Sequence, residues 1–128
     1  GDGWGGPNSG GRDVRRRQVT HPGGFLGRPT SEGDLDKAII KRYIKRYVDK
    51  IAYCYEKQLL ANPGLGGAMS VSFLIAPDGS VQASNGSGFH GEVASCVAGV
   101  IKSIHFPAPK NGGSVQVNYP FNFHAAGR

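Results

Sequence analysis

Residues 34–62 carry apolar side chains at intervals of three and four, the spacing that places them on one face of an α-helix. The apolar positions are Ile40, Ile44 with Tyr43, Tyr47, Ile51, Cys54 with Tyr55, and Leu59. Asp34 is predicted to cap the start of this helix. Asn62-Pro63-Gly64 ends it, because the residue before a proline is pushed out of the helical region. The pattern predicts one long amphipathic helix.

The apolar period then changes to two, which is typical of half-buried strands. In residues 67–76 the apolar series is Met69, Val71, Phe73 and Ile75. Pro77-Asp78-Gly79 has turn chemistry, and Asp78 is interpreted as a turn residue. A second strand follows, with Val81 and Ala83 facing inward, and residues 85–88 are expected to form a loop.

A second amphipathic helix and a third strand complete the pattern. The helix has its apolar face at Val93, Cys96, Val97, Val100, Ile101 and Ile104. The prolines of Phe106-Pro107-Ala108-Pro109 stop it. In the last strand Val115, Val117, Tyr119, Phe121 and Phe123 alternate with mainly polar residues. Because Pro120 cannot donate to a ladder, we expect this strand to lie at a sheet edge.

The element order α-β-β-α-β predicts an α+β fold, a three-stranded antiparallel sheet with two helices packed on one face. We expect the first strand in the centre and the last strand on the side away from the second. Residues 1–33 hold ten of the 21 glycines and show little apolar periodicity. This composition predicts a flexible linker at residues 1–33 and a folded domain at residues 34–128. Because the chain begins with Gly, we expect it to be a fragment of a longer protein.

The only two cysteines, Cys54 and Cys96, lie on or beside the apolar faces of the two helices. If both helices pack on one face of the sheet, the two sulfurs can meet, which predicts a disulfide and an oxidising compartment. The alternative is two unpaired buried thiols, because Cys behaves as a small hydrophobic residue.

The net charge of +6 is concentrated in Arg15-Arg16-Arg17 and on the first helix. A possible basic patch consists of Lys41, Arg42, Lys45, Arg46 and Lys50. Such a patch is either solvated or binds an anionic polymer, meaning nucleic acid, lipid headgroups or cell-wall glycans. No RNA-binding signature accompanies the charge, so nucleic acid is not the expected partner. Of Tyr53 and Tyr55, we expect one to pack inward and the other to point outward.

The chain offers little catalytic chemistry. Its four histidines are dispersed, and neither cysteine has a zinc-ligand neighbour at the usual spacing. A Cys–His nucleophile pair would have to use a cysteine on an apolar helix face, a poor setting for a reactive thiolate. We therefore expect no enzymatic activity, no cofactor and no metal.

Several motifs occur together in a fixed order. Cys54-Tyr55-Glu56 is followed by Leu-x-Gly-x-Met-x-Val-x-Phe-x-Ile at residues 65–75, then by Pro-Asp-Gly-x-Val at residues 77–81. His-Phe-Pro-Ala-Pro at residues 105–109 and Val-x-Val-x-Tyr-Pro-Phe-x-Phe at residues 115–123 complete the set. In this combination the chain resembles the C-terminal domain of TonB-type energy transducers. The two cysteines and the closing motif are similar to the AgmX/PglI-type branch from myxobacterial gliding motility.

The resemblance implies a non-catalytic periplasmic domain whose parent protein is anchored in the inner membrane. Such domains engage an outer-membrane or periplasmic partner and transmit force or energy. We expect the partner to add a strand to the predicted open edge, because an edge exposes unpaired backbone groups. The alternative is an edge already covered by the first helix or by the linker. That edge consists of Val115, Gln116, Val117, Asn118, Tyr119 and Phe121.

Overall fold

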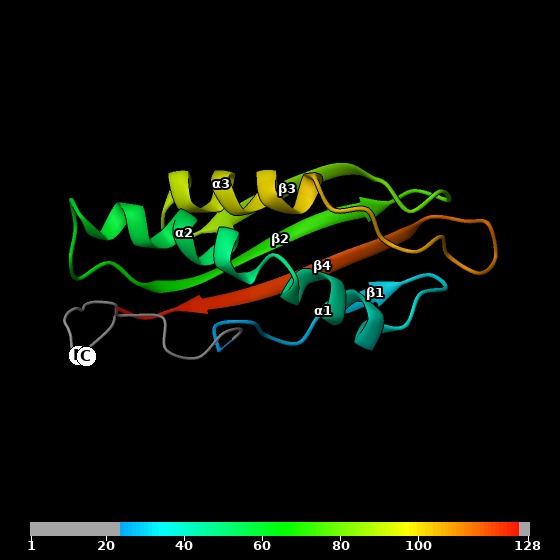
Figure 1. Ribbon diagram of the computed structural model, residues 1–128, viewed down its shortest axis with the longest axis horizontal. Helices are drawn as coiled ribbons and strands as arrows, with labels where there is room; N and C mark the ends of the chain where they lie inside the picture. The colour runs from blue at the N-terminus through cyan, green and yellow to red at the C-terminus, as the bar shows by residue number, and fades with distance from the viewer. Residues whose placement is uncertain (1–23, 126–128) are drawn as a thin grey trace, which may run out of the picture.

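A computed structural model describes residues 24–125 of the chain. The elements are β1 (Thr30–Glu32), α1 (Lys37–Lys45), α2 (Val48–Leu59), β2 (Gly67–Ile75), β3 (Val81–Gly88), α3 (Gly91–Lys102) and β4 (Val115–Phe123). They form an α+β fold with an antiparallel sheet in the order β1-β4-β2-β3. The fold class and the relative order of the three long strands agree with the prediction, and Figure 1 shows the additional strand β1 beside β4.

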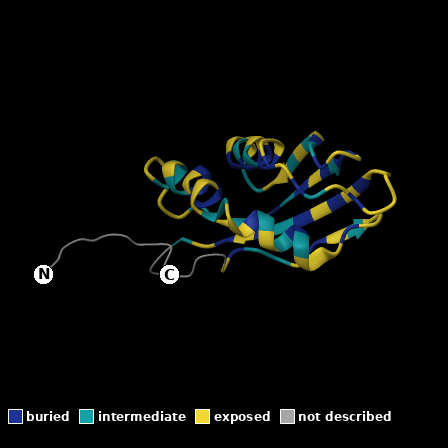
Figure 2. Cartoon of the chain, turned by 45° about the vertical axis from the view of Figure 1, so that its right-hand side comes forward, coloured by how far each residue is buried: buried dark blue, intermediate teal, exposed yellow. Residues whose placement is uncertain are grey.

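The helices lie against one face of the sheet, where the core is built. Along β4, buried and exposed residues alternate, with Val115, Val117, Tyr119, Phe121 and Phe123 all buried. The same alternation along the strands is visible in Figure 2. The other face carries polar side chains such as Gln116, Asn118 and Asn122, which are exposed. The period-two pattern of the sequence therefore gives a sheet with one solvated face.

The long helix predicted for residues 34–62 is in fact two helices, so the described residues contain three. Asp36, rather than Asp34, caps α1, since its carboxylate accepts from the N–H of Ala38 at 2.9 Å. Between the helices, Arg46 and Tyr47 donate to carbonyls three residues back, and Tyr47 has φ −110° and ψ 15°. This tight turn lets α1 lie over the β1 end of the sheet in Figure 1 while α2 runs beside α3.

The predicted loop at residues 85–88 is wrong, because β3 continues to Gly88 and pairs with β2 along its length. The register shifts between Leu74 and Ile75, so Val81 is buried whereas Ala83, predicted to face inward, is exposed. Asn, Gly and Ser are weak strand formers, but β2 supplies a complete partner for them. Tertiary pairing therefore overrides local propensity here.

The predicted open edge at Val115–Phe123 is also wrong. A segment at residues 25–32, which we call the strap, runs antiparallel along the outer side of β4. Its β1 residues pair with Gln116–Asn118, Gly27 donates its N–H to the Pro120 carbonyl at 2.9 Å, and Asn122 donates to the Phe25 carbonyl at 3.0 Å. The strap satisfies backbone groups that an edge strand would leave unpaired.

The boundary predicted at residue 33 must therefore move. Phe25 is buried in the core, where its ring centroid lies 4.9 Å from that of Phe123, and Leu35 is buried as well. Residues 24–33 thus belong to the folded domain. The remainder of the predicted linker, residues 1–23 with Arg15-Arg16-Arg17, lies outside the described residues.

Candidate functional site

The strap changes which backbone groups are accessible at the predicted partner site. Val115, Val117, Tyr119 and Phe121 point into the core, and their main chain lies between β2 and the strap. Gln116 and Asn118 lie on the exposed face, where the Gln116 amide donates to Ser72 Oγ at 2.9 Å. In the folded domain this strand has no free side for another strand.

The long edge strand is β3. In the described part of the chain β2 is the only strand that pairs with it, so its other side carries unpaired backbone donors and acceptors. Its sequence, VQASNGSG, contains no charged residue and no proline. Natural sheet edges are usually protected by charge, proline or a covering segment. Within its own sequence β3 therefore has neither the charge nor the proline that usually protects an edge.

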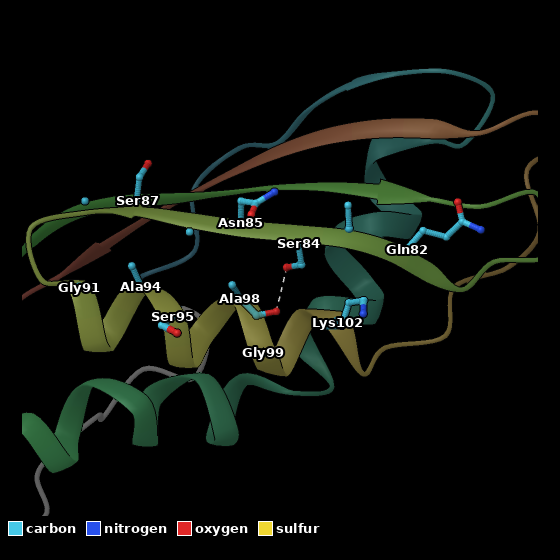
Figure 3. A pocket seen from close by; sticks show the side chains of 13 residues that line it. Gln82, Ser84, Asn85, Ser87, Gly91, Ala94, Ser95, Ala98, Gly99 and Lys102 are labelled. Atoms are coloured by element: carbon cyan, nitrogen blue, oxygen red, sulfur yellow. Dashed lines mark hydrogen bonds between the residues drawn. The ribbon is translucent and has the colours of Figure 1, made fainter.

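A groove of about 730 Å³ runs between this edge and α3. β3 contributes residues 82–88 to its lining. From α3 come mainly small residues one helical turn apart: Gly91, Ala94, Ser95, Ala98, Gly99 and Lys102. Figure 3 shows the strand and the helix flanking the groove, with α2 on the far side of α3. Lys102, at one end, is the only charged side chain in the lining.

Two contacts fix the strand to the helix at the base of this groove. Ser84 Oγ donates to the Ala98 carbonyl at 2.8 Å. At Gly86 the backbones approach so closely that a Cβ would lie 2.3 Å from the Ala94 carbonyl oxygen. Any side chain at position 86 would therefore separate β3 from α3, which explains a glycine inside the strand.

Gly99 has the opposite surroundings, because a Cβ added there meets nothing within 4 Å. A glycine in a helix interior costs about 1 kcal/mol relative to alanine. No contact within the described residues requires glycine at this position, and the absent side chain leaves space in the groove. The same open space surrounds Gly91 at the start of α3.

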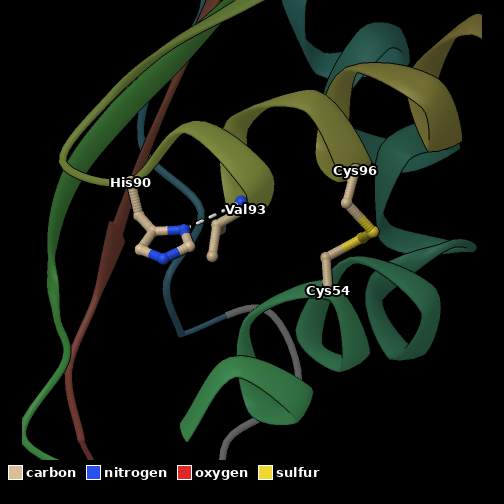
Figure 4. The surroundings of a disulfide bond; sticks show 4 residues. All are labelled: Cys54, His90, Val93 and Cys96. Atoms are coloured by element: carbon tan, nitrogen blue, oxygen red, sulfur yellow. Dashed lines mark hydrogen bonds between the residues drawn. A yellow bond between two sulfur atoms is a disulfide. The ribbon is translucent and has the colours of Figure 1, made fainter. Parts of the chain in front are cut away.

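Cys54 and Cys96 form a disulfide that joins α2 to α3, with their Cα atoms 5.6 Å apart (Figure 4). The disulfide prediction is confirmed, and the bond indicates an oxidising, non-cytoplasmic compartment. Neither sulfur is a thiolate nucleophile in this state. His90, drawn beside Val93 in Figure 4, caps α3: its Nδ1 accepts from the N–H of Val93 at 3.3 Å.

The titratable groups with shifted pKa values have structural explanations. Hydrogen bonds from the N–H and hydroxyl of Ser80 lower the pKa of Asp78, which is a turn residue as predicted. Burial, and to a smaller extent the charge of Glu56, raises the pKa of Tyr55, whose hydroxyl donates to the Leu65 carbonyl. Residues 24–125 contain no cluster of three potential metal ligands, and no helix there is both long and apolar enough to span a membrane.

The predicted basic patch lies on α1, α2 and the turn between them. Arg42, Lys45, Arg46 and Lys50 are exposed, and Lys41 is half-buried. The guanidinium carbon of Arg46 lies 4.2 Å from the ring centroid of Tyr43, and Lys50 Nζ lies 5.8 Å from that of Tyr47. As expected of the tyrosine pair, Tyr55 is buried and Tyr53 points outward.

Comparison of the chain with protein-family models, curated proteins and solved structures finds no match. The geometry of the site therefore carries the functional argument. Sequence reasoning missed the groove because residues 85–88 have the composition of a loop. One available signal was Gly99, a glycine within an otherwise regular helical pattern.

Proposed function

We propose that this chain is a non-catalytic interaction domain that receives an extended segment of a partner protein as a fifth strand beside β3. The observation that carries the proposal is the unpaired β3 edge, which lies beside a groove lined by small residues of α3. Backbone hydrogen bonds to the edge would supply affinity. Alternate side chains of the added strand would enter the groove, where Ala, Ser and Gly leave room for them.

The disulfide and the family resemblance support a location for this activity. An oxidising compartment includes the bacterial periplasm. The resemblance to TonB-type C-terminal domains supports a parent anchored in the inner membrane and a partner among the outer-membrane or periplasmic proteins of a trans-envelope complex. In that setting the domain transmits force or energy through the sheet. The strap redirects partner binding from β4 to β3, because it already occupies the outer side of β4.

The test selects peptides of eight residues, the length of β3, from a random display library against the whole chain. Recovered peptides are titrated into labelled protein, and backbone amide shifts are followed by NMR. We expect the largest shifts at residues 82–88. Affinity should change little with salt, since an added strand is held by backbone hydrogen bonds and not by ion pairs. Failure to recover peptides, or shifts confined to other elements, contradicts the proposal.

Gly99→Gln and Gly113→Gln form a matched pair for this test. Both positions have open space around an added Cβ, but only Gly99 lines the groove. Gly99→Gln should weaken peptide binding by roughly tenfold or more, equivalent to about 1.4 kcal/mol. It should also leave the fold intact, because glutamine favours helix over glycine. Equal affinities of the two variants would exclude the groove as the binding site.

A further inference from the structure

A second surface lies on the outer face of α2. Four residues spaced by three, four and three positions form one stripe along this helix and its C-cap: Lys50, Tyr53, Lys57 and Leu60. All four are exposed. Tyr53, at 61% exposure, and Leu60, at 87%, are the two large hydrophobic side chains of the described residues that stand out in solvent. The stripe therefore alternates cations with apolar groups.

The stripe lies on the exposed side of α2, a helix that is fixed to the rest of the domain on its other side. On the opposite side of α2, Ile51, Cys54 and Tyr55 are buried, and the disulfide from Cys54 ties the helix to α3. Lys57 Nζ lies 5.4 Å from the ring centroid of Tyr53, so cation and ring are presented together. The groove lies between β3 and α3 (Figure 3), and no residue of the stripe lines it.

The charge around the stripe is strongly positive. From residue 37 to residue 60 the chain has seven basic residues and two acidic ones, Asp49 and Glu56. Arg42 and Lys45 of α1 and Arg46 of the turn are also exposed, and they precede Lys50 in the chain. This surface complements a negatively charged partner.

We propose that the stripe docks on an anionic lipid bilayer. Lysine and arginine would pair with lipid phosphates, while the Tyr53 ring and the Leu60 side chain enter the boundary between headgroups and acyl chains. A soluble polyanion would pair with the cations but leave both apolar side chains in water. The alternation of the two residue types along one stripe favours the bilayer, which offers both environments.

The experiment measures sedimentation of the whole chain with two kinds of vesicle, pure phosphatidylcholine and phosphatidylcholine with about one-third phosphatidylglycerol. We expect binding to the anionic vesicles and little to the neutral ones. The pair Lys50→Gln with Lys57→Gln should weaken binding by roughly tenfold or more, since each cation near an anionic surface contributes measurably. Tyr53→Ser with Leu60→Ser should weaken it several-fold, because the inserted apolar area is lost.

Arg28→Gln with Lys110→Gln is the matched control, because it removes the same charge from exposed positions outside α1, α2 and the groove. Circular dichroism checks that all variants are folded. The proposal is overturned if the wild-type chain binds both kinds of vesicle equally. It is also overturned if the control pair and the Lys50/Lys57 pair bind the anionic vesicles with equal affinity. If a single-stranded oligonucleotide binds as tightly as the anionic vesicles and the Tyr53/Leu60 pair changes neither affinity, the surface binds polyanions and the bilayer assignment is wrong.

Discussion

Gly27 donates its backbone N–H to the carbonyl oxygen of Pro120, and this contact fixes the strap where the pairing of β4 is weakest. Pro120 has no N–H to return to the strap, so regular pairing stops on both sides of it. Leu26 forms an isolated antiparallel β-bridge with Phe121. The pairing between the strap and β4 then resumes at Thr30, opposite Asn118, with its register shifted by one residue. The proline that predicted an open edge instead marks a gap in the pairing with the strap.

Gly27→Val should loosen the strap. A Cβ at Gly27 would lie 2.7 Å from Pro120 Cγ and 2.9 Å from its carbonyl oxygen, closer than side-chain contacts allow. We expect a loss of about 1–3 kcal/mol in the free energy of unfolding. Hydrogen exchange should lose protection in residues 25–32 before β2 and β3. Gly64→Val is the control, because a Cβ there meets nothing within 4 Å. Unchanged protection at residues 25–32 would show that the strap is not held by this contact.

The strap illustrates what local sequence patterns cannot predict. Phe25 and Leu26 are adjacent rather than alternating, and Gly27 and Pro29 both disfavour strands. Pairing depends instead on β4, about 90 residues away, whose backbone groups need partners. By contrast, β2 and β4 each carry a long apolar alternation, and both were predicted with nearly the observed bounds.

The break between α1 and α2 was hidden for a different reason. The apolar spacing continues through residues 44–51, and no glycine or proline stands at the turn. Both α1 and α2 bury apolar residues at the same helical spacing, so this spacing does not reveal the change of direction between them. The groove could not be predicted from the sequence either, because it forms only when Ser84 and Gly86 of β3 contact α3. The disulfide was predictable since it needed only the apolar faces of two helices.

Reduction of the Cys54–Cys96 bond should destabilise the domain substantially. The bond joins residues 42 positions apart, and closing a loop of this length contributes about 4 kcal/mol on the chain-entropy model. Urea unfolding of oxidised and reduced protein measures the difference. The Cys54→Ala, Cys96→Ala double variant should match the reduced protein and be insensitive to reductant. Coincident unfolding curves for the oxidised and reduced forms would contradict a stabilising role for the bond.

Tyr119→Phe should remove a polar group that the core does not satisfy. The Tyr119 side chain is 0% exposed, and its hydroxyl has no hydrogen-bond partner within residues 24–125. Leaving a buried hydroxyl unpaired costs about 1–3 kcal/mol. At neutral pH we therefore expect the phenylalanine variant to unfold at an equal or higher urea concentration than the wild type. A loss of more than about 1 kcal/mol would instead show that the hydroxyl has a stabilising contact, such as a bound water.

The same substitution should change stability at alkaline pH. Burial raises the pKa of Tyr119 to about 12, from 10.0 for an unperturbed tyrosine. Between these values the unfolded chain releases the phenolic proton whereas the folded protein keeps it, so the unfolded state binds fewer protons. The contribution of Tyr119 is therefore fully present below about pH 10 and is lost as the pH rises toward 12. The loss is on the order of 2 kcal/mol. Urea unfolding across this range should show a steeper decline for the wild type than for Tyr119→Phe, and parallel declines would rule out a shifted Tyr119 as the cause.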